Sequence, residues 1–150
     1  MKPVSHTAGL STVPIDLTPD QVNEFVAEVF PASYADGMRC VSIDEGAAEV
    51  RWPFDEAKLR PGAYIPGPVM FALADSALWY ATFSVIGLEP MAVTSEMSIR
   101  FLRPGQGGDL LGRASINSVG TRRIVGTVEM WVEGKPDKLV AVAQGSYARP

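Results

Sequence analysis

The chain has 150 residues, 47% of them hydrophobic and 20% charged, which is typical of one soluble globular domain. Its formal net charge of −4 argues against a nucleic-acid partner, because a phosphate backbone attracts a broad basic surface. A single cysteine, Cys40, cannot form an intramolecular disulfide, so we expect a cytoplasmic protein.

The only histidine, His6, lies in an opening segment that contains several Ser, Thr and Pro residues. We expect residues 1–16 to be mobile and residues 17–150 to form a single domain. Catalysis by a histidine and a zinc site of His and Cys ligands are therefore disfavoured. Any chemistry has to use carboxylates, hydroxyls and backbone groups, and we expect no metal.

The first predicted element is a short amphipathic helix that begins after Thr18. Thr18 can cap this helix, with Pro19 at its first position and Gln21 three residues after the cap. The helix should end near Phe30 and Pro31. Two strands then follow at residues 38–43 and 48–52, joined by a turn at Glu45 and Gly46.

Residues 69–86 form an apolar stretch long enough to raise the question of a membrane span. Asp75 lies near its middle and its flanks carry no pair of basic anchors, so we interpret it as a helix buried in protein. Pro68 suits the first helical turn and Gly87 suits the helix end. Because nearly every face of this helix is apolar, protein must surround it on most sides.

Four long strands are predicted after this helix, at residues 92–102, 109–119, 123–133 and 139–148. In the third strand apolar and polar residues alternate, which predicts one buried face and one partly wet face. Residues 105–108, 120–121 and 133–138 should form hairpin turns, so the sheet should be antiparallel with largely local order. The fold class is α+β, and an open edge strand predicts at least a dimer.

Asp75 is the one charged residue in the apolar helix. A carboxylate at a cleft within such a helix suits a general base. The equally weighted structural alternative is an aspartate that bonds a nearby backbone group or hydroxyl, such as Ser76 or Thr82 on its own helix. Eight residues earlier, the amide of Gly67 at the helix start could hold an oxyanion, although a glycine there could simply make the turn.

The segments RPGAYIPGPVMFALADSALWYA, TSEMSIRFLRP and SVGTRRIVGTVEMW together resemble the PaaI-like branch of hotdog-fold acyl-CoA thioesterases, from about Leu59 to the C-terminus. The resemblance implies a hotdog fold, in which a curved antiparallel sheet of about six strands wraps a long central helix. It also implies a homodimer or homotetramer, hydrolysis of an acyl-CoA thioester, and no cofactor apart from the CoA of the substrate.

The resemblance also implies the roles of individual residues. Gly67 corresponds to the family glycine whose amide polarises the thioester carbonyl, and Asp75 to the carboxylate that activates water or attacks the thioester directly. Thr94 falls where members often hold a hydroxyl that steadies the water. The family's His is Pro66 here, its second Gly is Pro68, and Arg60 stands where a polar residue often helps to hold the substrate.

Large residues near the helix are expected to shape the acyl site, namely Tyr64, Phe71, Trp79 and Tyr80, two of which should only fill the core. Among Arg100, Arg103, Arg122 and Arg123, the last two are the favoured contacts for the CoA phosphates. Three alternatives stay open: a non-catalytic hotdog domain that binds acyl-CoA or another apolar ligand, a hydratase or dehydratase, and a structural dimer module. The hydratase is disfavoured because such sites generally use a buried histidine.

Overall fold

The structure is a computed structural model, and it describes residues 15–150. Residues 1–14, which hold His6 and most of the segment expected to be mobile, lie outside the described residues. The N-terminal helix begins as predicted: α1 (Pro19–Val29) is capped by Thr18, whose Oγ1 accepts from the Gln21 amide at 3.2 Å. Gln21 Oε1 in turn accepts from the Thr18 amide at 2.9 Å, so the capping box is complete.

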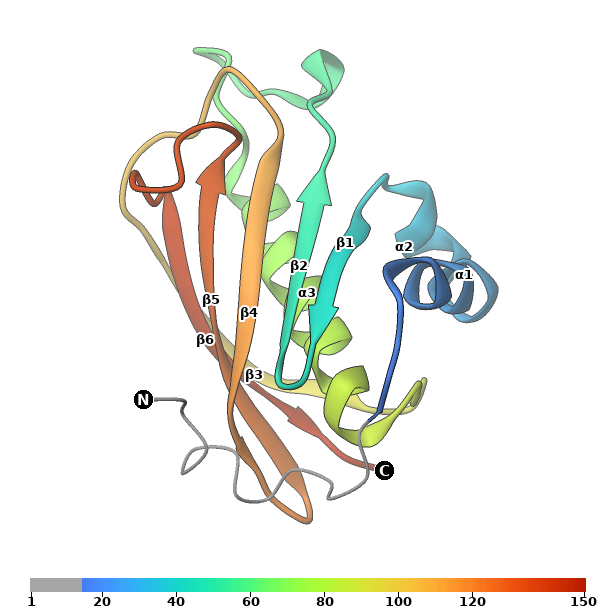
Figure 1. The fold of residues 1–150 in the computed structure, drawn as a ribbon. Coiled ribbons are helices and arrows are strands. Elements are labelled where there is room, and N and C mark those ends of the chain that lie inside the picture. Colours follow the sequence, from blue (N-terminus) through green and yellow to red (C-terminus); the bar gives the residue numbers. More distant parts are fainter. Residues whose placement is uncertain (1–14) are drawn as a thin grey trace.

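A second short helix, α2 (Pro31–Ala35), follows α1 directly and was not predicted. Pro31 both ends α1 and starts α2, because its ring fixes φ and removes a backbone donor. Phe30 is the junction residue between the two helices. In Figure 1 both helices lie beside β1, on the side of the molecule away from β4, β5 and β6.

Six antiparallel strands form one sheet, as predicted, in the spatial order β1-β2-β4-β5-β6-β3 (Figure 1). Their bounds are β1 (Arg39–Asp44), β2 (Ala47–Trp52), β3 (Val93–Phe101), β4 (Leu110–Val119), β5 (Arg123–Val132) and β6 (Ala141–Ala148). The expected burial alternation of β5 is confirmed, since Ile124, Val128 and Met130 are buried while Arg123 and Glu129 are exposed.

The hairpin expected at residues 105–108 is wrong. β3 does not pair with β4; it pairs with β6 at the far edge of the sheet. The reason is that both edges of β4 are occupied, one by β2 and the other by β5. Residues 102–109 therefore cross the end of the sheet, where the Leu102 amide donates to the Val140 carbonyl and the Ile65 amide donates to the Gly105 carbonyl. The local strand order expected from the sequence fails at this point.

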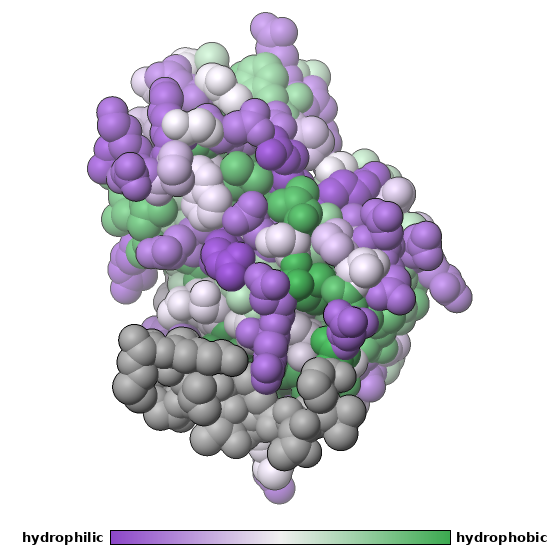
Figure 2. All heavy atoms as spheres, in the orientation of Figure 1, coloured by the Kyte–Doolittle hydropathy of each residue, from purple (hydrophilic) through white to green (hydrophobic). Residues whose placement is uncertain are grey.

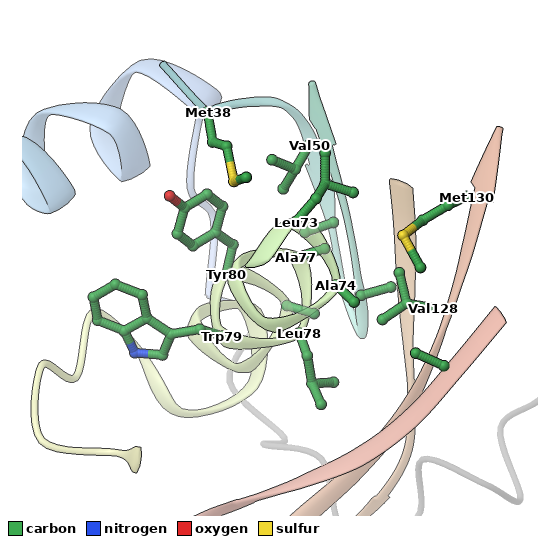
Figure 3. Close-up of a cluster of buried hydrophobic side chains, with 14 of the residues drawn as sticks. Met38, Val50, Leu73, Ala74, Ala77, Leu78, Trp79, Tyr80, Val128 and Met130 are labelled. Atoms are coloured by element: carbon green, nitrogen blue, oxygen red, sulfur yellow. The ribbon is translucent and has the colours of Figure 1, made fainter. Parts of the chain in front are cut away.

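The long helix α3 (Gly67–Ile86) packs against the inner face of this sheet, as predicted, and Gly87 ends it with φ +86°. Glycines of the sheet allow the close approach: a Cβ on Gly112 would lie 2.2 Å from Leu73 Cδ2, and one on Gly126 would lie 2.5 Å from Leu78 Cδ1. Figure 3 shows Leu73 and Leu78 pointing toward the strands. By length and composition α3 could cross a membrane, but 67% of its apolar window is buried in this fold.

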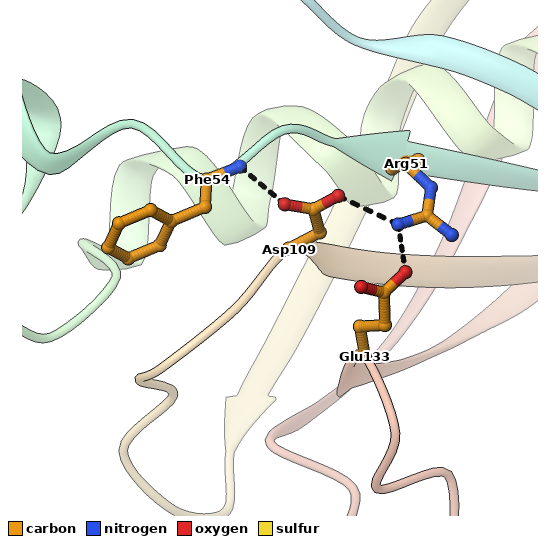
Figure 4. Close-up of polar contacts among 4 residues, drawn as sticks. All are labelled: Arg51, Phe54, Asp109 and Glu133. Carbon is orange, nitrogen blue, oxygen red and sulfur yellow. Dashed lines mark hydrogen bonds and ion pairs between the residues drawn. The ribbon is translucent and has the colours of Figure 1, made fainter.

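The outer face of the sheet is polar by comparison. In Figure 2, which views the molecule as in Figure 1, this face is mostly hydrophilic with scattered hydrophobic residues. At one end of the strands, Arg51 of β2 pairs with Asp109 at 2.7 Å and also with Glu133 (Figure 4). The Phe54 amide and Arg51 together hold the pKa of Asp109 below its usual value. This cluster joins the ends of β2, β4 and β5.

Candidate active site

Asp75 lies on a face of α3 that residues 15–150 leave open. Pro68, Phe71, Ala72 and Asp75 are spaced i, i+3, i+4 and i+7, so they form one stripe along the first half of the helix. Pro68, Phe71 and Ala72 are exposed, and Asp75 is half-buried. The carboxylate is therefore reachable and is not sealed inside the core.

Two hydroxyls from the sheet hold Asp75. Thr94 Oγ1 of β3 donates to Asp75 Oδ1 at 2.6 Å, and Tyr147 Oη of β6 donates to the same oxygen at 2.5 Å. Tyr147 Oη also lies 3.0 Å from the Asp75 carbonyl oxygen. Within residues 15–150 no group donates to Asp75 Oδ2. The carboxylate is thus fixed through one oxygen and leaves the other free.

Neither of the two hydroxyls expected as possible partners on the helix itself bonds Asp75. Thr82 donates its hydroxyl to the Trp79 carbonyl at 2.6 Å and is fully buried, and Ser76 makes no hydrogen bond to Asp75. Asp75 instead bonds hydroxyls from two neighbouring strands. Thr94 and Tyr147 are register partners on β3 and β6, which places their side chains on the same face of the sheet.

Tyr147 is a permanent donor in this arrangement. Its side chain is buried, and burial raises the pKa of its phenol far above the usual value, with the nearby Asp75 carboxylate adding to the shift. The raised pKa keeps the phenol protonated at neutral pH, so Tyr147 acts as a donor to Asp75. Sequence reasoning missed Tyr147, because only the pairing of β3 with β6 brings the last strand to Asp75.

Gly67 is the first residue of α3, and its backbone N–H has no acceptor among residues 15–150. The Pro66 carbonyl accepts from the amides of Val69 and Met70 at 3.1 and 3.2 Å, so these two donors are used. Pro68 has no N–H. The helix start therefore offers the single amide of Gly67, reinforced by the positive end of the helix dipole.

Two hollows meet at Asp75. The first, which we name the α1 hollow, has a volume of about 360 Å³ and lies between the end of α1, helix α3 and the start of β3. The second, the α3 groove, follows the open stripe from Gly67 to Asp75 and has a volume of about 640 Å³. The α1 hollow is lined by Val29, Phe30, Ser33, Asp75, Ser76, Trp79, Pro90, Ala92, Val93, Thr94 and Tyr147. Asp75 thus lies where the two spaces join.

A third hollow, the arginine groove, continues from the α3 groove past Gly67. It has a volume of about 720 Å³ and shares Gly67, Pro68 and Phe101 with the α3 groove. Its rim carries two exposed arginines, Arg60 and Arg103, and within residues 15–150 neither forms an ion pair. Tyr64 also lines it. The structure thus brings Arg60, Tyr64, Gly67 and Pro68 together.

The remaining predicted residues divide between core and surface. Trp79 and Tyr80 are buried, as expected for two of the four large residues, although Trp79 also forms a wall of the α1 hollow. Phe71 lines the α3 groove. Arg122 and Arg123 are exposed at the turn between β4 and β5 and line none of the three hollows. Pro66 is half-buried and precedes α3.

Known proteins share this sequence and this fold. Residues 63–138 match the family described as "Thioesterase superfamily". The acyl-coenzyme A thioesterase PaaI of Escherichia coli is 34% identical over 114 residues, which cover 75% of this chain and 78% of that protein. The structure of the E. coli PaaI protein superposes with a TM-score of 0.71 at 32% identity, covering 86% of this chain and 95% of that one.

A proposed thioesterase of a Silicibacter species superposes with a TM-score of 0.80 at 31% identity and covers 89% of this chain and 92% of its own. The expected hotdog fold is thereby confirmed, together with the resemblance on which it depended. By sequence and by fold, the chain belongs to the thioesterase superfamily, as a PaaI-like hotdog protein.

Proposed function

We propose that the protein hydrolyses acyl-CoA thioesters and that Asp75 is the catalytic carboxylate. The observation that carries this proposal is the geometry of Asp75, which is fixed through Oδ1 by Thr94 and Tyr147, has no donor on Oδ2 among residues 15–150, and lines two open hollows. The identity to an acyl-coenzyme A thioesterase supports the substrate class.

One chain does not form the whole site. Gly67 and Asp75 are eight residues apart on one helix, so their backbones are separated by about 12 Å at 1.5 Å per residue. A thioester carbon and its carbonyl oxygen cannot bridge that distance. The amide and the carboxylate that act on one substrate therefore come from two copies of the chain.

The open edge of the sheet supplies a way to bring two copies together. β3 is an edge strand, exposed along most of its length, and Met91, Val93 and Phe101 expose more than half of their surface. Antiparallel pairing of β3 with β3 of a second copy also reverses the direction of α3. The Gly67 end of one helix then lies toward Asp75 of the other, in a two-fold dimer with two sites.

The chemistry follows from these groups. The Gly67 amide and the dipole of α3 stabilise the negative charge that develops on the thioester oxygen. Asp75 Oδ2 takes a proton from water, the water oxygen bonds to the carbonyl carbon, the carbon–sulfur bond breaks, and the proton passes to the CoA sulfur. Direct attack by Oδ2 on the carbon, followed by hydrolysis of the anhydride, uses the same geometry. Because the Thr94 hydroxyl donates its hydrogen bond to Asp75, Thr94 can only accept a hydrogen bond from the attacking water.

Two pairs of arginines are candidates for the CoA phosphates. Arg60 and Arg103 flank the groove that contains Gly67, whereas Arg122 and Arg123 lie at the β4–β5 turn. Replacing each pair with glutamine and measuring KM for an acyl-CoA against an acyl-pantetheine separates them. The pair that holds phosphate raises KM for the CoA ester alone, because pantetheine lacks the CoA nucleotide and its phosphates.

The proposal is tested with a panel of acyl-CoA esters and detection of the released thiol. Asp75→Asn should lower turnover at least about tenfold and leave CoA binding intact. Asp137→Asn, on the exposed β5–β6 turn, is the matched control and should behave as wild type. Unchanged turnover in Asp75→Asn would remove Asp75 from the mechanism.

A second candidate function is binding of acyl-CoA without catalysis. The observation in its favour is the turn before α3, where Pro66 and Pro68 leave Gly67 as the only donor. Loss of one oxyanion donor costs on the order of 3 kcal/mol in other enzymes. If wild type and Asp75→Asn are equally inactive while both bind an acyl-CoA, this second function is correct.

A cytoplasmic location remains a prediction from the single buried cysteine.

A further inference from the structure

We infer that the α1 hollow is the acyl site and that it buries acyl chains up to a limited length, with Phe30 as the residue that sets this limit. This inference rests on the proposed function, because it places the reacting carbon at Asp75. From Asp75 a substrate can extend in two directions, into the α1 hollow or toward the Gly67 end of the second copy's α3, where the arginine groove of that copy lies.

Charge decides which end of the substrate takes which direction. CoA is a polyanion, and the arginine groove carries Arg60 and Arg103 at its rim. The described residues that line the α1 hollow include no Lys or Arg, and their only charged group is the Asp75 carboxylate. The CoA arm therefore leaves through the arginine groove beside the acting Gly67 amide, and the acyl group enters the α1 hollow.

The walls of the α1 hollow suit an apolar group. Val29, Phe30 and Trp79 form one side, and Pro90, Ala92 and Val93 contribute from the segment that leads into β3. The polar side chains of the lining are hydroxyls and Asp75. Of these, the Thr94 and Tyr147 hydroxyls already donate hydrogen bonds to Asp75. Burial of an acyl chain against such walls is favourable, and each methylene that fits contributes about fourfold in affinity.

The volume sets an upper limit on the acyl group. At liquid-like packing, roughly 30 Å³ for each non-hydrogen atom, about 360 Å³ holds about 12 such atoms. A hexadecanoyl chain exceeds this limit and has to leave part of its length in water. The hollow therefore buries acyl groups of up to medium length, and the gain per methylene should stop between octanoyl and dodecanoyl.

Phe30 is placed to limit the chain. It is the junction residue of α1 and α2, half of its surface is exposed, and its ring meets the Trp79 ring edge-on at 6.3 Å between centroids. Trp79 is buried and also packs on Phe83 and Tyr80, so it belongs to the core as well. The Phe30 side chain can therefore be removed without opening the core.

The test measures kcat/KM for a series of saturated acyl-CoA esters from butanoyl to hexadecanoyl. We expect a rise of about fourfold per methylene up to the limit and no further gain from there to hexadecanoyl. Phe30→Ala should move the limit about four carbons higher. Val29→Phe, which narrows the same hollow, should move it lower.

Phe54→Ala is the matched control, because Phe54 is an exposed phenylalanine that lines none of the three hollows. The inference is overturned if the series has no limit, or if Phe30→Ala and Phe54→Ala share the wild-type limit. If no ester is hydrolysed, the same series is measured as binding of non-hydrolysable thioether analogues. If the affinity of the analogues stops rising at a certain chain length, and Phe30→Ala shifts that length, the acyl site is supported although the proposed catalysis fails. If the affinity shows no such limit, the proposed acyl site is overturned.

Discussion

The two halves of α3 have the same apolar character and opposite surroundings. From Ala77 to Val85 every side chain is buried, whereas the first half keeps Pro68, Phe71 and Ala72 exposed. The second half is covered by the sheet on one side and by α1 on the other, where Phe25 meets Phe83 edge-on at 5.5 Å. The first half packs against the sheet on one side, and its other side is the exposed stripe.

This difference shows that the hydrophobicity of a helix does not by itself say what covers it. The sealed half contributes stability, and the open half carries Asp75, proposed above as the catalytic carboxylate, and the exposed apolar stripe proposed to face a second copy. The comparison therefore assigns different consequences to similar substitutions in the two halves.

The largest expected effect is on stability in the sealed half. Leu78→Ala should lower the free energy of unfolding by about 2–5 kcal/mol, because Leu78 is fully buried against the glycines of β5 and β6. Phe71→Ala, in the open half, should cost less than about 1 kcal/mol in dilute protein. Urea unfolding measures both variants.

Protein concentration sharpens this contrast. If two copies pair over the open stripe, the cost of Phe71→Ala grows with protein concentration, since association stabilises the folded state by mass action. The cost of Leu78→Ala should not depend on concentration. Equal costs for the two variants at every concentration would mean that the halves do not differ in this way.

A second, smaller effect is expected at the glycine that faces the sealed half. A Cβ on Gly126 would lie 2.5 Å from Leu78 Cδ1 and 2.8 Å from the Ser115 carbonyl oxygen, and the backbone atom cannot move aside cheaply. Gly126→Ala should destabilise the fold by about 1–3 kcal/mol through overpacking. Thr127→Ala, the neighbouring residue on the outer face of β5, is the control, and a thermal melt that shifts equally for both would contradict the explanation.

A third prediction concerns the hydroxyls that hold Asp75 in the open half. Tyr147→Phe should lower kcat about tenfold and leave KM nearly unchanged, because the carboxylate loses one of two donors while substrate contacts stay. Thr94→Val should do the same, and Thr94→Ser, which keeps the hydroxyl, should restore most of the activity. A rise in KM with unchanged kcat would instead place these residues in substrate binding.

The same contrast explains how far sequence reasoning reached. The cap at Thr18, the bounds of α3 and the end at Gly87 depend on neighbouring residues, so they were predicted correctly. The position of β3 in the sheet was not predicted correctly, because it depends on β2 and β5 pairing with the two edges of β4. Tyr147 was missed for the same reason: no local pattern links it to Thr94, and only the β3–β6 register does.

The last effect is a dependence of stability on alkaline pH, to which Tyr80 of the sealed half and Cys40 of β1 contribute alongside Tyr147. Burial raises the pKa of Tyr80 to about 12, and burial likewise raises the pKa of the Cys40 thiol to about 12. In the unfolded chain these groups lose their protons at lower pH, near 10 and 9. The stability that they contribute is therefore complete below about pH 9 and is lost as the pH rises toward 12.

Urea unfolding between pH 8 and pH 11 measures this loss, which cannot exceed about 1.4 kcal/mol per pH unit for each group. Tyr80→Phe and Cys40→Ala each remove one titrating group, so each should flatten the decline, whatever it costs in packing at pH 8. Tyr64→Phe, which changes an exposed tyrosine next to the open half, should leave the decline as steep as in wild type. If the decline is equally steep in all four proteins, Tyr80 and Cys40 do not cause it. That result would mean that both groups are hydrated in the folded protein at high pH and titrate there as they do in the unfolded chain.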